Sequence, residues 1–303
     1  MPLKIAVPDL ISNSYFPAVA AVELGLLAEQ GLDSTIELIF PVSKAYAALR
    51  EGTIDCVAGS AHSALAAFPE WEGAKLLCAQ AQGMYWFLVM RSDLNAARGD
   101  VGIVKGKKIG AAPWVDLGLK RLLVAAGIDE KGDGVSIVPV PNTGEASTNF
   151  GLMAAKALQQ GLVDGFWANG MGAAVAVQSG AGQIVLDVRR GDGPRECFNY
   201  TMASIAVTDD FLAQRPDDAR KIVKAIDATH QALKRNVVLA EKVGRKVFSP
   251  NEAKLITGLI ERDLPFYSTA ISRDFVSGMN SFARGVGILQ GDPQYQDVVA
   301  SHL

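Results

Sequence analysis

Short apolar runs alternate with stretches of helical periodicity along the first two thirds of the chain. The first cycle is predicted to contain strands at 3–7, 36–40 and 54–58 and helices at 17–29 and 44–51. Ser43 is predicted to cap the second of these helices, and a further helix is expected after Ser60. Because a strand–helix–strand rhythm needs crossover connections, the pattern predicts a parallel sheet covered by helices.

A second cycle of the same kind begins near Lys107. It is predicted to contain strands at 108–112, 135–140, 163–168 and 183–188 and helices at 114–126 and 148–160. After Asp209 only helical periodicity remains, with one long or broken helix predicted at 216–247 and further helices at 251–264 and 272–287. The chain is therefore expected to be an α/β protein with additional C-terminal helices.

The two cycles share a short internal repeat. Residues 48–55 and 157–164 both follow the pattern A-L-x-x-G-x-[I/V]-D. Its glycine can take a positive φ, which ends a helix and lets a buried strand begin at once. The repeat indicates two related lobes, although the same punctuation also recurs by chance in α/β proteins.

Composition and charge exclude several classes of protein. The chain of 303 residues carries 29 basic and 32 acidic side chains, and its net charge of −3 makes nucleic-acid binding an unfavourable hypothesis. No apolar run reaches the ~18–20 residues that span a bilayer, so no membrane insertion is expected. The three cysteines, Cys56, Cys78 and Cys197, form neither a disulfide framework nor a metal motif, and no metal or cofactor is predicted.

Candidate binding residues lie in the loops that follow the predicted strands. In open parallel sheets, ligands bind beyond the carboxyl ends of the strands, where helix N-termini favour anions. Small hydroxyl and amide residues are concentrated in these loops: Ser12, Asn13, Ser14, Ser43, Ser60 and Asn169. Trp114 and Trp167 are candidates for an aromatic wall, although Trp167 lies within an apolar strand and suits a core position equally well.

Several segments in this order resemble a known family. They are residues 20–33, 48–55 with Gly59-Ser60, 104–110, 157–164 and 211–217. With this spacing the chain, from about residue 4 to about 249, resembles the solute-binding proteins of ABC transporters. The similar branch handles nitrate, sulfonates, taurine and thiamine-pyrimidine precursors.

The resemblance implies a two-lobed periplasmic-binding-protein fold of type II, each lobe a mainly parallel sheet flanked by helices. Lobe 1 is expected to comprise 1–88 and 206–303 and lobe 2 to comprise 89–205, with hinges near 87–91 and 203–207 and a ligand cleft between the lobes. The family's ligand loops fall on Asn13, Ser14, Tyr15, Ser43, Gly59, Ser60, Ala61, Pro113, Trp114 and Asn169. We add His62 and Trp167 to these candidates from their own positions.

The resemblance also implies a function. The expected ligand is a small anion or heteroaromatic compound, such as a sulfonate, a carboxylate or a pyrimidine, which a monomeric receptor delivers to an ABC permease. The opening Met1-Pro2-Leu3 has no charged leader. If the sequence is trimmed of a signal peptide, the periplasm is expected, which most of the family favours. If Met1 is the native start, the cytoplasm is expected.

A cytosolic enzyme on the same fold is the alternative hypothesis. His62 would act as general base on an aromatic or pyrimidine-like substrate, with Asn13, Ser14 or Ser60 as oxyanion donors. The catalytic cysteine of a related sulfinate desulfinase is absent from the loop 11–15, and the pyridoxal-phosphate lysine of a related pyrimidine synthase is absent from 57–59. His62 would otherwise be a ligand donor or an ordinary residue of a first helical turn.

Two further motifs can be interpreted either as structural or as functional features. Residues 170–175 mimic a dinucleotide fingerprint, but Val175 stands where close packing requires Gly or Ala. Arg189, Arg190 and Arg195 form a basic cluster that either clamps a ligand carboxylate or is simply solvated.

Overall fold

The chain folds into two compact units in a computed structural model that describes residues 2–143 and 149–301. Unit 1 comprises Met1–Gly83 and Asn199–Leu303, and unit 2 comprises Met84–Phe198. The predicted lobe boundaries at 88 and 206 fall inside β5 (Phe87–Arg91) and β10 (Ala203–Thr208). Each unit contains one five-stranded sheet flanked by helices, which confirms the predicted α/β fold class.

The sheet of unit 1 has the strand order β2-β1-β3-β10-β4. Besides β10, its strands are β1 (Leu3–Val7), β2 (Ser34–Leu38), β3 (Cys56–Ser60) and β4 (Ala74–Ala81). β1 pairs in parallel with β2 and β3, whereas β10 runs antiparallel between β3 and β4. Four strands are therefore parallel to one another and end at one edge of the sheet, which we call the carboxyl edge of unit 1.

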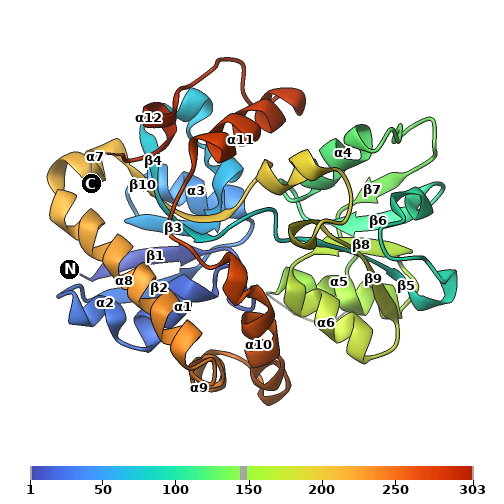
Figure 1. Ribbon diagram of the computed structural model, residues 1–303, viewed down its shortest axis with the longest axis horizontal. Helices are drawn as coiled ribbons and strands as arrows, with labels where there is room; N and C mark the ends of the chain where they lie inside the picture. Colours follow the sequence, from blue (N-terminus) through green and yellow to red (C-terminus); the bar gives the residue numbers. More distant parts are fainter. Residues whose placement is uncertain (1, 144–148, 302–303) are drawn as a thin grey trace. The chain divides into compact units, whose positions relative to one another are not determined.

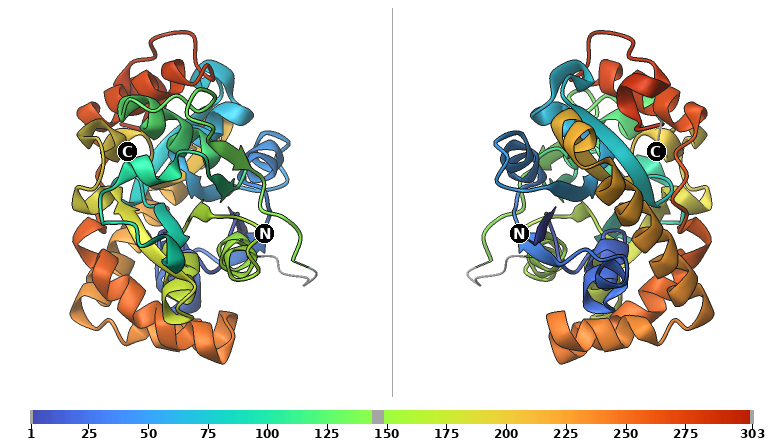
Figure 2. Two further views of the ribbon diagram at one scale, coloured as in Figure 1. Left: turned by 90° about the vertical axis from the view of Figure 1, so that its right-hand side faces the viewer. Right: turned by 90° about the vertical axis from the view of Figure 1, so that its left-hand side faces the viewer.

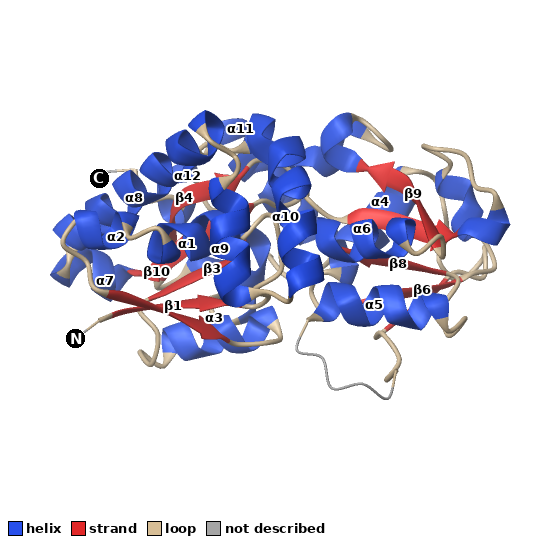
Figure 3. Ribbon diagram, turned by 90° about the horizontal axis from the view of Figure 1, so that it is seen from below, coloured by secondary structure: helices blue, strands red, loops and turns tan. Residues whose placement is uncertain are grey.

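Helices cover both faces of this sheet. The helices of unit 1 are α1 (Phe16–Glu23), α2 (Leu26–Glu29), α3 (Val42–Arg50), α7 (Asp209–Gln214), α8 (Pro216–Arg235), α9 (Leu239–Val247), α10 (Pro250–Asp263), α11 (Arg273–Gly285) and α12 (Tyr295–Val298). α3 packs below the strands in Figure 3, and α1 lies above them. The long helix α8 runs beside α1, as the right-hand view of Figure 2 shows.

Two predicted helices of unit 1 differ from the observed ones. The helix expected over 17–29 is split by Gly25, whose φ of +78° stops α1 before α2 begins. The stretch 216–247, predicted as one long or broken helix, is broken at Asn236 into α8 and α9. The helix expected after Ser60 is the 3₁₀ segment η1 (Ala61–Ala66), which is followed by the 3₁₀ turn η2 (Pro69–Trp71).

The sheet of unit 2 has the order β7-β6-β8-β5-β9. Its further strands are β6 (Lys108–Ala111), β7 (Ser136–Val138), β8 (Gly165–Ala168) and β9 (Gly182–Asp187). β5 runs antiparallel between β8 and β9, so the other four strands end together at the carboxyl edge of unit 2. In Figure 1, α4 (Asp116–Ala125) lies on one side of these strands, and α5 (Phe150–Gln159) and α6 (Gly170–Gln178) lie on the other.

The glycine-rich run at the start of α6 serves helix packing. A Cβ atom on Gly172 would lie 2.5 Å from the carbonyl oxygen of Gly151 in α5. Such a contact is far inside van der Waals distance, so only glycine lets the two helices approach this closely. The resemblance of residues 170–175 to a dinucleotide fingerprint is thus accounted for by the contact between α5 and α6.

Candidate functional site at the carboxyl edges of the two sheets

The loop between β1 and α1 buries an unusual number of polar side chains. Ser12, Asn13 and Ser14 are each no more than 1% exposed, although hydroxyl and amide residues in loops are ordinarily solvated. Tyr15, also buried, is the N-cap residue of α1. The loop after β1 therefore holds its polar side chains away from solvent.

Asn13 is held at this edge by residues from the other end of the chain. Its Nδ2 donates to the carboxylate of Asp263 at the end of α10. Its carbonyl oxygen accepts a hydrogen bond of 2.6 Å from the hydroxyl of Tyr267. Among residues 2–143 and 149–301, however, neither Asn13 Oδ1 nor Ser14 Oγ has a hydrogen-bond partner. Because an unsatisfied buried polar atom costs about 1–3 kcal/mol, these two atoms mark a place where a ligand or water would be stabilised.

The end of β3 is packed more conventionally. Ser60 Oγ lies 2.6 Å from Ser63 Oγ, and the carbonyl oxygen of Ser60 accepts a bond of 3.0 Å from the Tyr46 hydroxyl. Burial raises the pKa of Tyr46 well above its usual range, so this hydroxyl stays protonated. A Cβ on Gly59 would meet the Val57 side chain at 3.1 Å. The N–H of Ala61 donates at 2.9 Å to the carbonyl oxygen of Met202, just before β10.

Ser43 does not cap a helix, contrary to the prediction. α3 already begins at Val42, with Pro41 as its N-cap residue and no side-chain cap bond. Ser43 lies in the first turn and is half-buried. The position remains at the carboxyl edge, because α3 is the helix that follows the end of β2.

His62 is fully buried, with an exposed fraction of 0%. Its Nδ1 lies 2.9 Å from Thr201 Oγ1, and its ring meets the ring of Phe282 edge-on at 5.4 Å. The Ser63 hydroxyl lies 3.5 Å from Nε2. A general base must reach a proton of its substrate, and these contacts instead fix the ring within unit 1. The enzyme alternative is therefore not favoured.

The carboxyl edge of unit 2 is rich in tryptophan. Trp114 follows β6 with a φ of +72°, a left-handed conformation that costs a bulky residue ~1–3 kcal/mol and that often occurs at functional sites. Trp114 is half-buried, and Pro113 beside it is exposed. Trp167 in β8 is completely buried, with its ring 6.3 Å from that of Trp86. In the described part of the chain Trp167 Nε1 has no hydrogen-bond acceptor.

Asn169 follows β8 and caps α6. Its Oδ1 accepts a bond of 3.1 Å from the N–H of Gly172. The side chain thus satisfies one of the free N–H groups at the helix start.

The predicted basic cluster divides into three different environments. Arg189, in the 3₁₀ turn η5 (Val188–Arg190) after β9, is only 5% exposed. Arg190 is exposed and pairs with Asp187 at 2.9 Å, and Arg195 is exposed. A buried guanidinium is uncommon, so Arg189 becomes a candidate anion ligand at this edge.

Sequence reasoning missed Asp263 and Tyr267. Asp263 has an exposed fraction of 0% and forms an ion pair of 3.4 Å with Arg262. Both residues contact a loop about 250 positions earlier in the chain. No local pattern signals such a contact; the only available hint was a charged residue on the apolar face of a predicted helix.

Metal and thiol chemistry find no support in the described residues. No group of histidine, cysteine and acidic side chains that suits a metal ion occurs in 2–143 and 149–301. All three cysteines are free and buried. Burial raises the pKa of Cys78 to about 12 and that of Cys56 further, so both thiols are unreactive. Within the same residues, no helix combines the length and apolar character that crossing a bilayer requires.

Comparison with known proteins identifies the fold. No family model matches the chain, and no curated protein matches its sequence. A solved protein from Bordetella bronchiseptica is similar with a TM-score of 0.76 and 20% identity, over 98% of this chain and 92% of that one. The alkanesulfonate-binding protein SsuA from Xanthomonas axonopodis pv. citri, bound to MOPS, gives 0.71 and 13%, over 99% and 96%. The periplasmic nitrate-binding protein NrtA from Synechocystis gives 0.70 and 14%, over 96% and 83%.

These similarities establish the architecture. The chain has the periplasmic binding protein fold, as the sequence resemblance predicted. The named neighbours are solute-binding proteins for sulfonate and nitrate. At these levels of identity the shared property is the fold itself.

Proposed function

We propose that this chain is a solute-binding protein that captures a small anionic or heteroaromatic ligand for an ABC importer. The observation that carries the proposal is a set of buried polar atoms without partners among the described residues, located at the carboxyl edges of both sheets. They are Asn13 Oδ1 and Ser14 Oγ in unit 1 and Trp167 Nε1 in unit 2. This edge is where open α/β sheets bind ligands.

The chemistry of unit 2 supports an anionic group on the ligand. The indole N–H of Trp167 can only donate, and the Arg189 guanidinium carries a buried positive charge. Trp167 is the last residue but one of the strand β8, and Arg189 follows the parallel strand β9. Donors of this kind suit the oxygen atoms of a sulfonate, a carboxylate or nitrate.

The biological setting is part of the same proposal. The named neighbours include periplasmic binding proteins, which supports an exported, periplasmic receptor that works with a membrane permease. We propose that it acts as a monomer. The cleft predicted between the lobes and the candidate residues Tyr15, Ser43, Ala61 and Pro113 stay predictions.

A thermal-shift screen tests the proposal. The ligands are ethanesulfonate, nitrate, propanoate and 4-aminopyrimidine, with chloride at equal ionic strength as the control. A true ligand at a hundred times its Kd stabilises the protein by ~2.7 kcal/mol. A melting temperature that no compound raises beyond chloride would contradict the proposal.

A pair of matched variants then locates the binding. Trp167→Phe removes the indole N–H from the carboxyl edge and is expected to weaken anion affinity about tenfold to a hundredfold. Trp71→Phe is the control, because Trp71 is buried, also has no acceptor for its Nε1 in the described chain, and lies in η2, away from the carboxyl edge. Equal anion affinities of the two variants would show that the indole N–H of Trp167 does not bind the ligand.

A further inference from the structure

The amide of Asn13 has a defined orientation. A carboxylate can only accept hydrogen bonds, so the neighbouring Asp263 requires the NH₂ end of the amide to face it. The other end, Oδ1, is thereby turned away from Asp263. It is buried and has no donor among residues 2–143 and 149–301. The loop after β1 therefore contains a hydrogen-bond acceptor with unused capacity.

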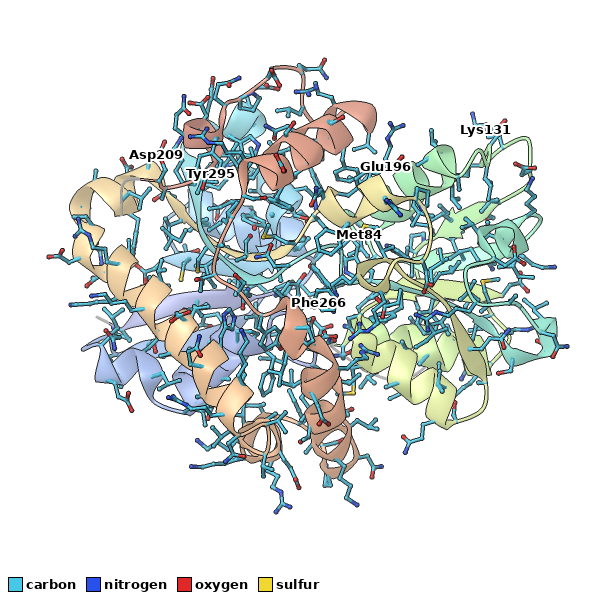
Figure 4. The ribbon with its side chains drawn as sticks, in the orientation of Figure 1. Met84, Lys131, Glu196, Asp209, Phe266 and Tyr295 are labelled. Carbon is cyan, nitrogen blue, oxygen red and sulfur yellow. The ribbon has the colours of Figure 1, made fainter. Side chains whose placement is uncertain are left out.

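The C-terminal segment keeps this arrangement rigid. The buried Tyr267 donates to the carbonyl oxygen of Asn13 at 2.6 Å, and its own carbonyl oxygen accepts from Lys234 Nζ at 2.8 Å. The preceding residue, Phe266, is labelled in Figure 4 and ends the 3₁₀ turn η7 (Leu264–Phe266) that follows α10. Its carbonyl oxygen accepts a backbone bond of 2.8 Å from the N–H of Gln82, which follows β4. Rotating the Asn13 amide would bring Oδ1 against the Asp263 carboxylate, which is unfavourable because both groups are acceptors. The amide therefore keeps its NH₂ end toward Asp263.

The electrostatics at this place favour a donor. Asp263 brings a fully buried carboxylate next to the amide, and Arg262 forms an ion pair with it at 3.4 Å. An anion placed against Asn13 Oδ1 would meet both a carbonyl dipole and this charge. An amine, an ammonium group or a hydroxyl would instead satisfy the oxygen.

We infer that the ligand carries a hydrogen-bond donor, separate from its anionic group, that meets Asn13 Oδ1. This inference rests on the proposed function and narrows it to bifunctional ligands such as amino- or hydroxy-substituted acids. Asp263 is a positioning residue, since it selects the donor-seeking face of Asn13 without touching the ligand.

Matched ligand pairs test the inference by isothermal titration calorimetry on the unmodified protein. The pairs are ethanesulfonate with 2-aminoethanesulfonate and propanoate with 3-aminopropanoate. In at least one pair the amino member is expected to bind about tenfold more tightly or better. Pairs that bind with equal affinity would overturn the inference, because Asn13 Oδ1 would then need no ligand donor. If no member of any pair binds and no compound of the thermal-shift screen binds either, the proposed function itself fails. A protein that binds only nitrate or 4-aminopyrimidine, neither of which combines an anionic group with a separate donor, would overturn the inference alone.

Three variants assign the preference to its residues. Asn13→Ala removes the acceptor, so the amino preference should disappear while the unsubstituted member binds as before. Asp263→Asn frees the amide to flip, so the preference should fall and the unsubstituted member should bind equally well or better. Asn280→Ala is the control, because Asn280 in α11 is also buried with an unpartnered Oδ1 within the described chain. Retention of the full preference in Asn13→Ala would overturn the inference. If that variant does not fold, the wild-type ligand pairs still test the inference, because equal affinities within them overturn it.

Discussion

The two units share a helix-to-strand connection, which leads into β3 in unit 1 and into β8 in unit 2. They differ at the carboxyl edges of their sheets. The repeated segment ends in Asp55 in unit 1 and in Asp164 in unit 2. Asp55 accepts a bond of 2.8 Å from the N–H of Lys4, and Asp164 accepts one of 2.9 Å from the N–H of Lys108. In each unit the repeat thus ties the end of a helix to the first parallel strand.

The carboxyl edges of the two sheets differ in their hydrogen-bonding groups: unit 1 presents an acceptor, and unit 2 presents donors. Unit 1 presents an acceptor, Asn13 Oδ1, beside the carboxylate of Asp263. Unit 2 presents the Trp167 indole N–H and the guanidinium of Arg189. A shared scaffold with opposite edge chemistry indicates that the strands and helices preserve the fold, whereas the loops determine which ligand is bound.

The largest expected effect concerns a packing contact found in unit 2. Gly172→Ala would place a methyl group 2.5 Å from a backbone oxygen of α5, so α5 and α6 would have to separate. We expect a loss of about 3 kcal/mol in the free energy of unfolding, measured by urea denaturation. Gly258→Ala in α10 is the control, because a Cβ there meets nothing within 4 Å, and it should stabilise the protein by about 0.5–1 kcal/mol. Equal effects of the two substitutions would refute this account of the glycine-rich run.

A pH effect of similar size should be confined to unit 1. Burial lowers the pKa of His230 to about 4, and Lys234 nearby adds to the effect. Because the unfolded chain binds this proton near the ordinary pKa of about 6.5, the stabilisation is complete above that pH and declines as pH falls toward 4, by about 3 kcal/mol. Unit 2 contains no histidine.

Hydrogen exchange at pH 7 and pH 5 checks this difference between the units. Protection should fall at pH 5 in α8, which carries His230, more than in the strands of unit 2. His230→Gln retains an N–H donor for the carbonyl oxygen of Gln80 and should remove the extra loss. An undiminished pH effect in this variant would assign the loss to other groups.

The smallest effect compares the two copies of the repeat directly. Asp55→Ala and Asp164→Ala should each cost about 1–2 kcal/mol of stability in denaturant unfolding. Asp55→Ala should cost more, because Asp55 also pairs with Arg215 at 2.7 Å, whereas Asp164 lies 3.7 Å from Arg91. Asp93→Ala, which removes an exposed ion pair with Arg91, is the control and should change little. The reverse order for Asp55 and Asp164 would contradict the comparison.

Hydrophobic periodicity, together with the residues that end helices, predicted most of the fold. Strands and helices that alternate along the chain were identified by type, because each buries one recognisable face. β4 was missed, since nearly all of its residues are buried and it shows no alternation. Gly25 broke a helix that periodicity alone joined, because the backbone change there needs only one residue.

The candidate site was only partly accessible from the sequence. The loop with Asn13 and Ser14 could be placed because it follows a strand directly. The residues that orient it, Asp263 and Tyr267, come from a helix end and a turn whose local sequence carries no binding motif. Contacts over such separations are set by the tertiary fold, which a single sequence does not display.

The indole resonances of the protein give the most direct test of binding at the carboxyl edges. The chain has four tryptophans, so a ¹⁵N–¹H spectrum resolves Trp167 and Trp71 once each is assigned by its Phe variant. Saturation with the tightest ligand of the screen should shift the Trp167 indole proton downfield, as a new hydrogen bond to an anion requires, and leave the Trp71 signal in place. An unchanged Trp167 signal at saturation would contradict the account.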